Sequence, residues 1–114
     1  VANINEFTIN ENFDIIYSSG LLHCIPEKNR KDILENLISH TNIDGIHAMN
    51  TFVNKPFINK APDTEEHTYT WKSGELFSHY SDFNIKKCDE IIFDCNSGGK
   101  PHRHCMNTII AERV

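Results

Sequence analysis

Two apolar runs with a helical pattern between them dominate the first half of this sequence. The runs are Phe13–Tyr17 and Gly45–Val53, and near-continuous apolar residues of this length are typical of strands covered on both faces. Between them, one apolar stripe recurs at helical spacing and is formed by Ile33, Leu34, Leu37 and Ile38. Strand, helix and strand in this order predict a βαβ unit, with parallel strands and a right-handed crossover.

Both ends of the predicted helix carry typical signals. Pro26 suits the first turn, where a backbone N–H would lack a partner, and the Glu27 carboxylate suits the positive end of the helix dipole. The polar stretch from His40 to Asn42, followed by Gly45, ends the helix.

The second half begins with its least regular stretch. Prolines and an acidic run interrupt any periodicity in Asn54–Thr68, which we interpret as a surface loop or, alternatively, as a lid on the substrate side. A short helix is predicted at Gly74–Tyr80, with Ser73 as its N-cap.

The last third of the chain predicts an antiparallel hairpin. Asn84–Asp94 is mixed at its start and apolar later, and His104–Glu112 is predicted as the final strand. The turn Asn96–Pro101 between them is short, which favours direct antiparallel pairing. The whole pattern predicts an α/β domain with helices flanking one sheet.

Composition narrows the possible partners. The chain has 114 residues, enough for one domain, and its 39% hydrophobic and 24% charged content is typical of a globular protein. The net charge of −5 disfavours nucleic acid and anionic membranes as partners, and no apolar run approaches the roughly 18 residues of a membrane span. The cysteines form no CxxC pair, so we expect free thiols in the cytoplasm.

Two short stretches carry candidate chemistry. Small residues follow the first strand at Ser18, Ser19 and Gly20, and ligands of open α/β sheets bind at the carboxyl ends of strands. The alternative is a tight turn without function. His23, just beyond, is either a proton acceptor or a structural histidine near a helix start.

The second stretch is His102-Arg103-His104, the only concentrated basic spot. A guanidinium flanked by imidazoles can hold an oxyanion, and the alternative is a set of solvated turn residues.

A metal site is the rival hypothesis for the histidines and cysteines. Because strand neighbours alternate faces, His104 and Cys105 should diverge, and no spacing matches a structural zinc motif, so we predict no metal. The residues considered as ligands are His23, Cys24, Cys95, His102, His104 and Cys105.

Three segments resemble the C-terminal half of a class I, S-adenosylmethionine-dependent methyltransferase. The first, NFDIIYSSGLLHCIP, is similar to the fourth-strand motif, and the second, NIDGIHAMNTF, to the fifth-strand segment. The third, WKSGELFSHYSDFNIKKCDEIIFD followed by HRHCMNTIIAERV, resembles the tail of the tellurite-resistance TehB-like group. The resemblance implies a partial Rossmann-like sheet that contains strands four to seven.

The resemblance also implies roles for particular residues. Asn3 and Ile4 would face the adenine of S-adenosylmethionine, while Ser18, Ser19 and Gly20 would approach its methionine part. His23 and Arg103 would be catalytic. His102 and His104 would contact a small acceptor, a tellurite- or selenite-type oxyanion.

The sequence departs from the family in its donor-binding half. The glycine-rich loop after the first strand and the acidic residue after the second have no counterpart in residues 1–114, and Gly98-Gly99 follows no parallel strand. We therefore expect a single partial domain that binds S-adenosylmethionine weakly or not at all. The alternative is a non-catalytic interaction module.

In the family fold this strand pairs with the family's first strand, which has no counterpart in residues 1–114, so one edge of Phe13–Tyr17 would be exposed. An exposed strand edge is a template for pairing, so we expect Phe13–Tyr17 to pair with a second copy in a two-fold dimer.

Overall fold

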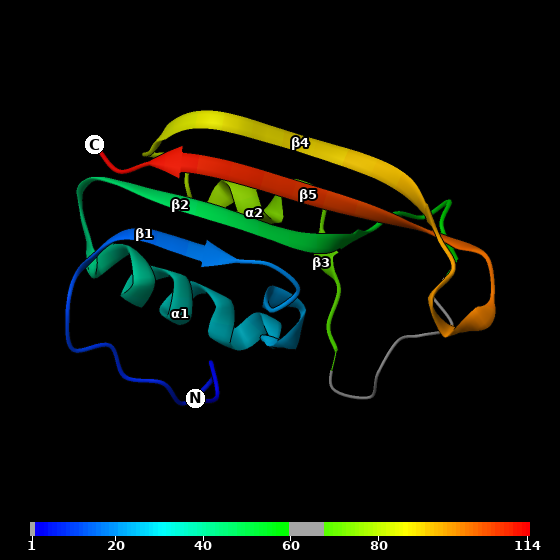
Figure 1. Ribbon diagram of the computed structural model, residues 1–114, viewed down its shortest axis with the longest axis horizontal. Helices are drawn as coiled ribbons and strands as arrows, with labels where there is room; N and C mark the ends of the chain where they lie inside the picture. The colour runs from blue at the N-terminus through cyan, green and yellow to red at the C-terminus, as the bar shows by residue number, and fades with distance from the viewer. Residues whose placement is uncertain (1, 60–67) are drawn as a thin grey trace.

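A five-stranded sheet with two α-helices forms the body of the described part of the chain (Figure 1). The computed structural model describes residues 2–59 and 68–114. In chain order the main elements are β1 (Phe13–Ser18), α1 (Glu27–Ser39), β2 (Thr41–Asn54), β4 (Asn84–Cys95) and β5 (His102–Glu112). The strand order is β1-β2-β5-β4, with β1 parallel to β2 and the remaining pairs antiparallel. The predicted α/β sheet, parallel strand pair and C-terminal hairpin are confirmed.

Several short elements escaped the sequence analysis. They are the 3-10 helices η1 (Leu22–Cys24) and η2 (Ser97–Gly99) and the two-residue strand β3 (Trp71–Lys72), which pairs in parallel with the end of β2. The helix α2 (Glu75–Ser78) is shorter than the predicted Gly74–Tyr80. None of these elements is long enough to show a hydrophobic period.

The predicted cap of α2 is wrong. Gly74 occupies the N-cap position with φ of +78°, in the left-handed region that glycine adopts most easily. The Ser73 hydroxyl is turned away from the helix and donates a hydrogen bond to the Glu90 carboxylate at 2.6 Å.

One face of the sheet packs against both helices. In β2, Met49, Thr51 and Val53 are buried while the alternating residues are half-buried, as expected from the two-residue period of a strand. We call the helix-covered side the covered face and the opposite side, which bears Asn50 and Phe52, the open face. The hydrophobic core on the covered face comprises Leu22, Ile25, Leu34, Met49, Trp71, Leu76, Tyr80, Ile109 and Ala111.

The prediction that the first strand is covered on both faces is wrong. β1 lies at the edge of the sheet, and among the described strands it pairs with β2 alone (Figure 1). Ile15 is 68% and Tyr17 71% exposed, because both helices pack on the covered face and the side chains of Ile15 and Tyr17 point away from it. Only Ile16 and Ser18 of β1 are packed inward.

A buried arginine joins α1 to the segment around α2. The Arg30 side chain is only 4% exposed and its guanidinium lies 4.3 Å from the centre of the Trp71 ring. Its nitrogens donate to the carbonyl of Ile25 at 3.1 Å, the carboxylate of Glu75 at 2.8 Å and the carbonyl of Thr70 at 3.2 Å. The charge is therefore paired and hydrogen-bonded, as a buried charge must be.

A second buried polar group, His47, is held neutral. Thr41 donates its hydroxyl proton to the Leu37 carbonyl at 2.7 Å, so it accepts from His47 Nε2 at 2.6 Å. His47 Nδ1 then accepts from the Tyr80 hydroxyl at 2.8 Å. Burial, and secondly the charge of Arg113, lower the pKa of His47 to about 4.

No helix within residues 2–59 and 68–114 is both long and apolar enough to cross a membrane.

Candidate functional site

The loop Ser18–Gly20 at the carboxyl end of β1 is held by a side chain from the neighbouring strand. Asn50 of β2 accepts a hydrogen bond from the Gly20 amide at 3.3 Å and donates one to the Ser19 hydroxyl at 3.1 Å. Asn50 was not among the site residues predicted from the sequence. The feature of the sequence that could have indicated Asn50 is its position near the carboxyl end of the second parallel strand, where side chains of adjacent strands converge.

The same loop presents groups that are suited to a ligand. The Ser18 hydroxyl is buried and has no hydrogen-bond partner among the described residues, which is uncommon for a buried polar atom. Gly20 has a φ of +69°, and no heavy atom lies within 4 Å of the position that a side chain would occupy. The loop therefore combines an unpaired polar atom with open space beside the backbone.

His23 lies in η1, directly after this loop. Its side chain is half-buried, and its backbone carbonyl accepts a hydrogen bond from the Tyr69 amide at 2.7 Å. The indole of Trp71 donates to the adjacent Leu22 carbonyl at 3.0 Å, so the buried core fixes the backbone of η1. His23 is thus placed on a well-held segment next to the loop.

The N-terminal turn lies against the same segment. The Asn5 side chain donates to the Cys24 carbonyl at 3.3 Å, and the Asn3 side chain accepts from the Asn5 amide at 2.9 Å. Ile4 packs against the hydrophobic core. The structure therefore brings Asn3 and Ile4, from the predicted adenine side, next to the segment that carries His23.

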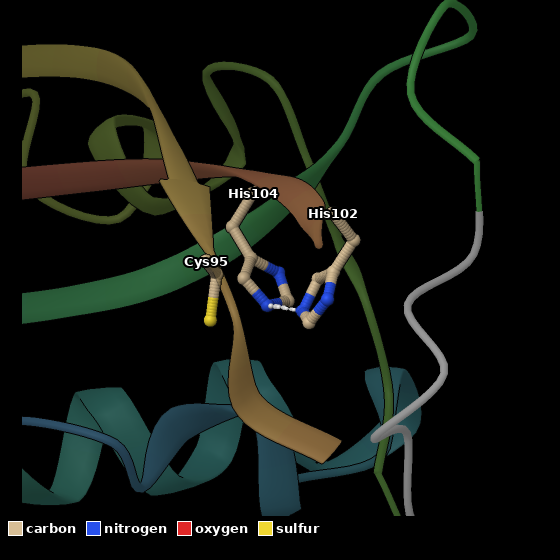
Figure 2. Close-up of side chains that lie close together, drawn as sticks. All are labelled: Cys95, His102 and His104. Carbon is tan, nitrogen blue, oxygen red and sulfur yellow. Dashed lines mark hydrogen bonds between the residues drawn. The ribbon is translucent and has the colours of Figure 1, made fainter. Parts of the chain in front are cut away.

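The basic triplet is divided between the two faces of the hairpin. His102 and His104 face each other with their Nε2 atoms 2.9 Å apart (Figure 2). Arg103 lies between them on β5 and is exposed, so the alternation of the strand turns it to the opposite face. An oxyanion held by a guanidinium between two imidazoles is therefore not the arrangement found.

The hairpin tip and the Ser18–Gly20 loop are separate sites. Ser18 pairs in register with Met49, and Met49 with Ile109. His104 precedes Ile109 by five residues, which corresponds to roughly 17 Å along the strand.

The open face connects the two sites. Asn50, which holds the loop, and Phe52 lie on the same face of β2. Phe52 stacks on His104 with ring centroids 4.4 Å apart and an interplanar angle of 17°. Asn50, Phe52 and His104 therefore share the face of the sheet that extends from the loop to the hairpin tip.

The covered face near the hairpin carries an ion pair that the sequence analysis did not identify. Lys55 lies 2.6 Å from the Glu90 carboxylate, and hydrogen bonds from Lys55 and Ser73 lower the pKa of Glu90. Cys105 is 2% exposed on this face, and burial raises the pKa of its thiol. The predicted divergence of Cys105 from His104 is confirmed.

Comparison with curated proteins found no match. Among solved structures, the chain is similar to TehB from Haemophilus influenzae, with a TM-score of 0.84, 20% identity, and coverage of 100% of this chain and 40% of that one. It is similar to a SAM-dependent methyltransferase from Methanosarcina mazei, with a TM-score of 0.70, 15% identity, and coverage of 99% and 65%.

A third similar structure is 1,6-didemethyltoxoflavin-N1-methyltransferase from Burkholderia thailandensis, which holds S-adenosylhomocysteine. The TM-score is 0.66 with 14% identity, and the match covers 99% of this chain and 49% of that one. Over these three structures, the chain spans between 40% and 65% of the relative's length. The likeness confirms the Rossmann-like methyltransferase fold.

A family model gives the more specific result. The model described as tellurite resistance protein TehB matches residues 1–102, which is most of the sequence. The chain therefore belongs to the TehB family.

Proposed function

We propose that this chain forms the carboxyl-terminal part of an S-adenosylmethionine-dependent methyltransferase site that acts on a small acceptor. The observation that carries the proposal is the Ser18–Gly20 loop, which ends a parallel strand and is hydrogen-bonded to Asn50, in a chain of the TehB family. Ligands of open α/β sheets bind at this edge.

The residues at this edge fit part of the methyl donor. When bound, S-adenosylmethionine supplies a methyl group, whose bond to the sulfonium sulfur breaks as the acceptor's lone pair forms a new one. Ser18 offers an unpaired buried hydroxyl to the methionine part, and Gly20 leaves room for close approach. Asn3 and Ile4 lie against η1 and would contact the adenine side.

The donor requires further residues outside this set. The paired glycines Gly98 and Gly99 lie in η2 between antiparallel strands, so they do not form the glycine loop that follows a parallel strand. We therefore propose that residues 1–114 are one partial domain. We also propose that this chain alone binds the donor weakly and does not catalyse methyl transfer.

The acceptor would lie on the side of His23 and the hairpin. His23 is half-buried beside the loop and can orient the acceptor or take a proton from it. Arg103 is exposed at the hairpin tip, where its charge can attract an oxyanion. We propose His102 and His104 as contacts for an acceptor bound on the opposite face of the hairpin. A tellurite- or selenite-type acceptor is supported by the family and by these cationic and imidazole groups.

The net charge and the cysteines support a proposal about binding partners and cellular location. A net charge of −5 does not favour nucleic acid, and no disulfide joins the four cysteines, which suits the cytoplasm.

The experiment is methyl transfer by the full-length protein that contains this chain. With methyl-labelled S-adenosylmethionine and tellurite or selenite, we expect label on the oxyanion, and a roughly tenfold or greater loss of kcat in the His23→Gln variant. The matched control is Lys72→Ala, an exposed residue outside the proposed site, which should keep the wild-type rate. Absence of label on every small acceptor supplied, with the protein folded, would overturn the proposal.

A further inference from the structure

Three side chains at the tip of the β4–β5 hairpin form a cluster of metal-ligand type. Cys95, His102 and His104 each direct one ligand atom inward, and these atoms lie within 4.8 Å of one another (Figure 2). All three residues are half-buried. The geometry points to a binding site for one Zn²⁺ ion, and we propose this site as a property of the chain beyond the methyl transfer discussed above.

Hairpin register explains why these residues meet. Cys95 pairs directly with His102 across the two strands, and His104 lies two residues further along β5. Residues opposite each other, and residues two apart, share one face of a sheet. All three side chains therefore share one face, whereas Arg103 and Cys105 face the other way.

A backbone hydrogen bond prepares His102 as a ligand. Its Nδ1 lies 2.7 Å from the Lys100 carbonyl, and because a carbonyl can only accept, Nδ1 carries the proton. The Nε2 atom then presents its lone pair to the centre of the cluster. Metal-bound histidines almost always donate their other ring N–H in this way, which fixes the tautomer and the orientation of the ring.

Aromatic rings hold His104 in position. Its ring stacks on Phe52 and lies 5.8 Å from the Phe93 ring, centroid to centroid. Packing on two sides limits rotation of the imidazole, so little ordering is needed when an ion binds. The apolar surface also keeps part of the water away from the cluster.

The spacing suits tetrahedral zinc after small shifts. Zinc bonds of about 2.0–2.3 Å require ligand atoms roughly 3.3–3.6 Å apart. The two Nε2 atoms, now 2.9 Å apart, must separate slightly, and the sulfur must move inward from a group that spans at most 4.8 Å. On binding, the His104 proton moves from Nε2 to Nδ1, and the Cys95 thiol proton leaves to solvent.

One thiolate with two imidazoles favours Zn²⁺ over the hard cations, which prefer oxygen ligands. Three protein ligands leave the fourth zinc position to water or a small anion. The site is therefore of the open type and not a closed structural centre.

The test is metal binding by the reduced, purified 114-residue chain, measured by competition with a chromogenic chelator and, separately, by Co²⁺ absorption. We expect one Zn²⁺ per chain and a thiolate-to-cobalt charge-transfer band. Cys95→Ser, His102→Gln and His104→Gln should each weaken Zn²⁺ binding by about 100-fold or more, since the loss of a residue that only hydrogen-bonds to a metal ligand already costs about 10–100-fold. Circular dichroism will show that these variants remain folded.

The matched control is Cys88→Ser, which removes an exposed cysteine from the same strand and should bind Zn²⁺ like the wild type. Equal weakening in Cys88→Ser would overturn the proposal, as would unchanged binding in Cys95→Ser. A ratio of one ion to two chains would also overturn it, because the ion would then bridge copies. Because this readout needs no methyl donor, failure here leaves the proposed methyl transfer untouched.

Discussion

At the scale of single residues, buried polar groups fix the protonation and position of the core. His47 is fully buried and both of its ring nitrogens are hydrogen-bonded, to Thr41 and Tyr80. Arg30 uses its guanidinium to hold η1, β3 and α2 together. These contacts stabilise the segments that carry the candidate site without being part of it.

The neutral state of His47 predicts a pH-dependent stability. The pKa of His47 is about 4 in the folded state against an ordinary value of 6.5, so between these pH values the unfolded state binds more protons. The free energy of unfolding should therefore fall as the pH falls, by about 2 kcal/mol between pH 7 and pH 5 from this residue. Urea unfolding at several pH values measures this.

The His47→Gln variant is the control for that measurement. It removes the titrating group, so its free energy of unfolding should depend much less on pH in this range, although it will be lower at pH 7. His79 also has a lowered pKa, chiefly through burial, and will leave a small residual slope. An undiminished slope in the variant would show that His47 is not held neutral.

Residue-level prediction from sequence failed where three-dimensional neighbours decide the outcome. Asn50 sits within an apolar run, and nothing local indicates that its amide holds a loop 30 residues away. Serine is a common N-cap residue, but the hydroxyl of Ser73 is hydrogen-bonded to both members of the Lys55–Glu90 ion pair, which come from distant segments. Arg103 was grouped with its sequence neighbours, although the two-residue period of a strand separates them.

At the scale of elements, the strongly periodic segments were predictable. The stripe of α1 and the proline before it placed the helix start within one residue, since α1 begins at Glu27. The apolar run of β2 and the short turn of the hairpin gave the parallel and antiparallel pairs. The cluster at the hairpin tip required the register between β4 and β5, which the sequence analysis did not use.

The edge strand β1 leads to a prediction about assembly. We propose that the exposed edge of β1 pairs with that of a second copy, because an unpaired apolar strand is a template for another. The chain should be a dimer at micromolar concentration in light scattering. The Ile15→Lys variant should be monomeric, because like charges would face each other near the two-fold axis.

The matched control for the edge is Ile43→Lys. Ile43 is 63% exposed, close to the 68% of Ile15, but it lies on β2, away from the free edge. This variant should remain dimeric. A monomeric wild type would contradict pairing through β1, and a monomeric Ile43→Lys would show that general surface charge and not the edge is responsible.

At the scale of the whole molecule, the sheet displays its candidate chemistry at one end. The carboxyl ends of β1 and β2 and the turn between β4 and β5 lie at the same end of the sheet (Figure 1). The Ser18–Gly20 loop lies there with Asn50, and the hairpin tip extends beyond it. This arrangement places the edge proposed to bind the donor and the imidazoles of the hairpin tip at the same end of the sheet, as two separate sites.

The overall fold was predicted better than the site because the two depend on different information. The strands and their order can be predicted from hydrophobic periodicity together with the family resemblance. The site depends on which side chains meet across β2, β5 and the loops, and Asn50 entered it only through those contacts. Cys95 was considered as a ligand from the sequence, but its position opposite His102 follows only from the strand register.

We propose above all that the loop at the end of β1 contacts the methyl donor. The most direct measurement is a titration of the ¹⁵N-labelled chain with S-adenosylhomocysteine, followed through amide chemical shifts. We predict weak binding, without saturation at micromolar ligand, and shifts concentrated at Ser18, Ser19, Gly20 and Asn50. Shifts that spare these residues at millimolar ligand, or that occur only elsewhere in the chain, would contradict the claim.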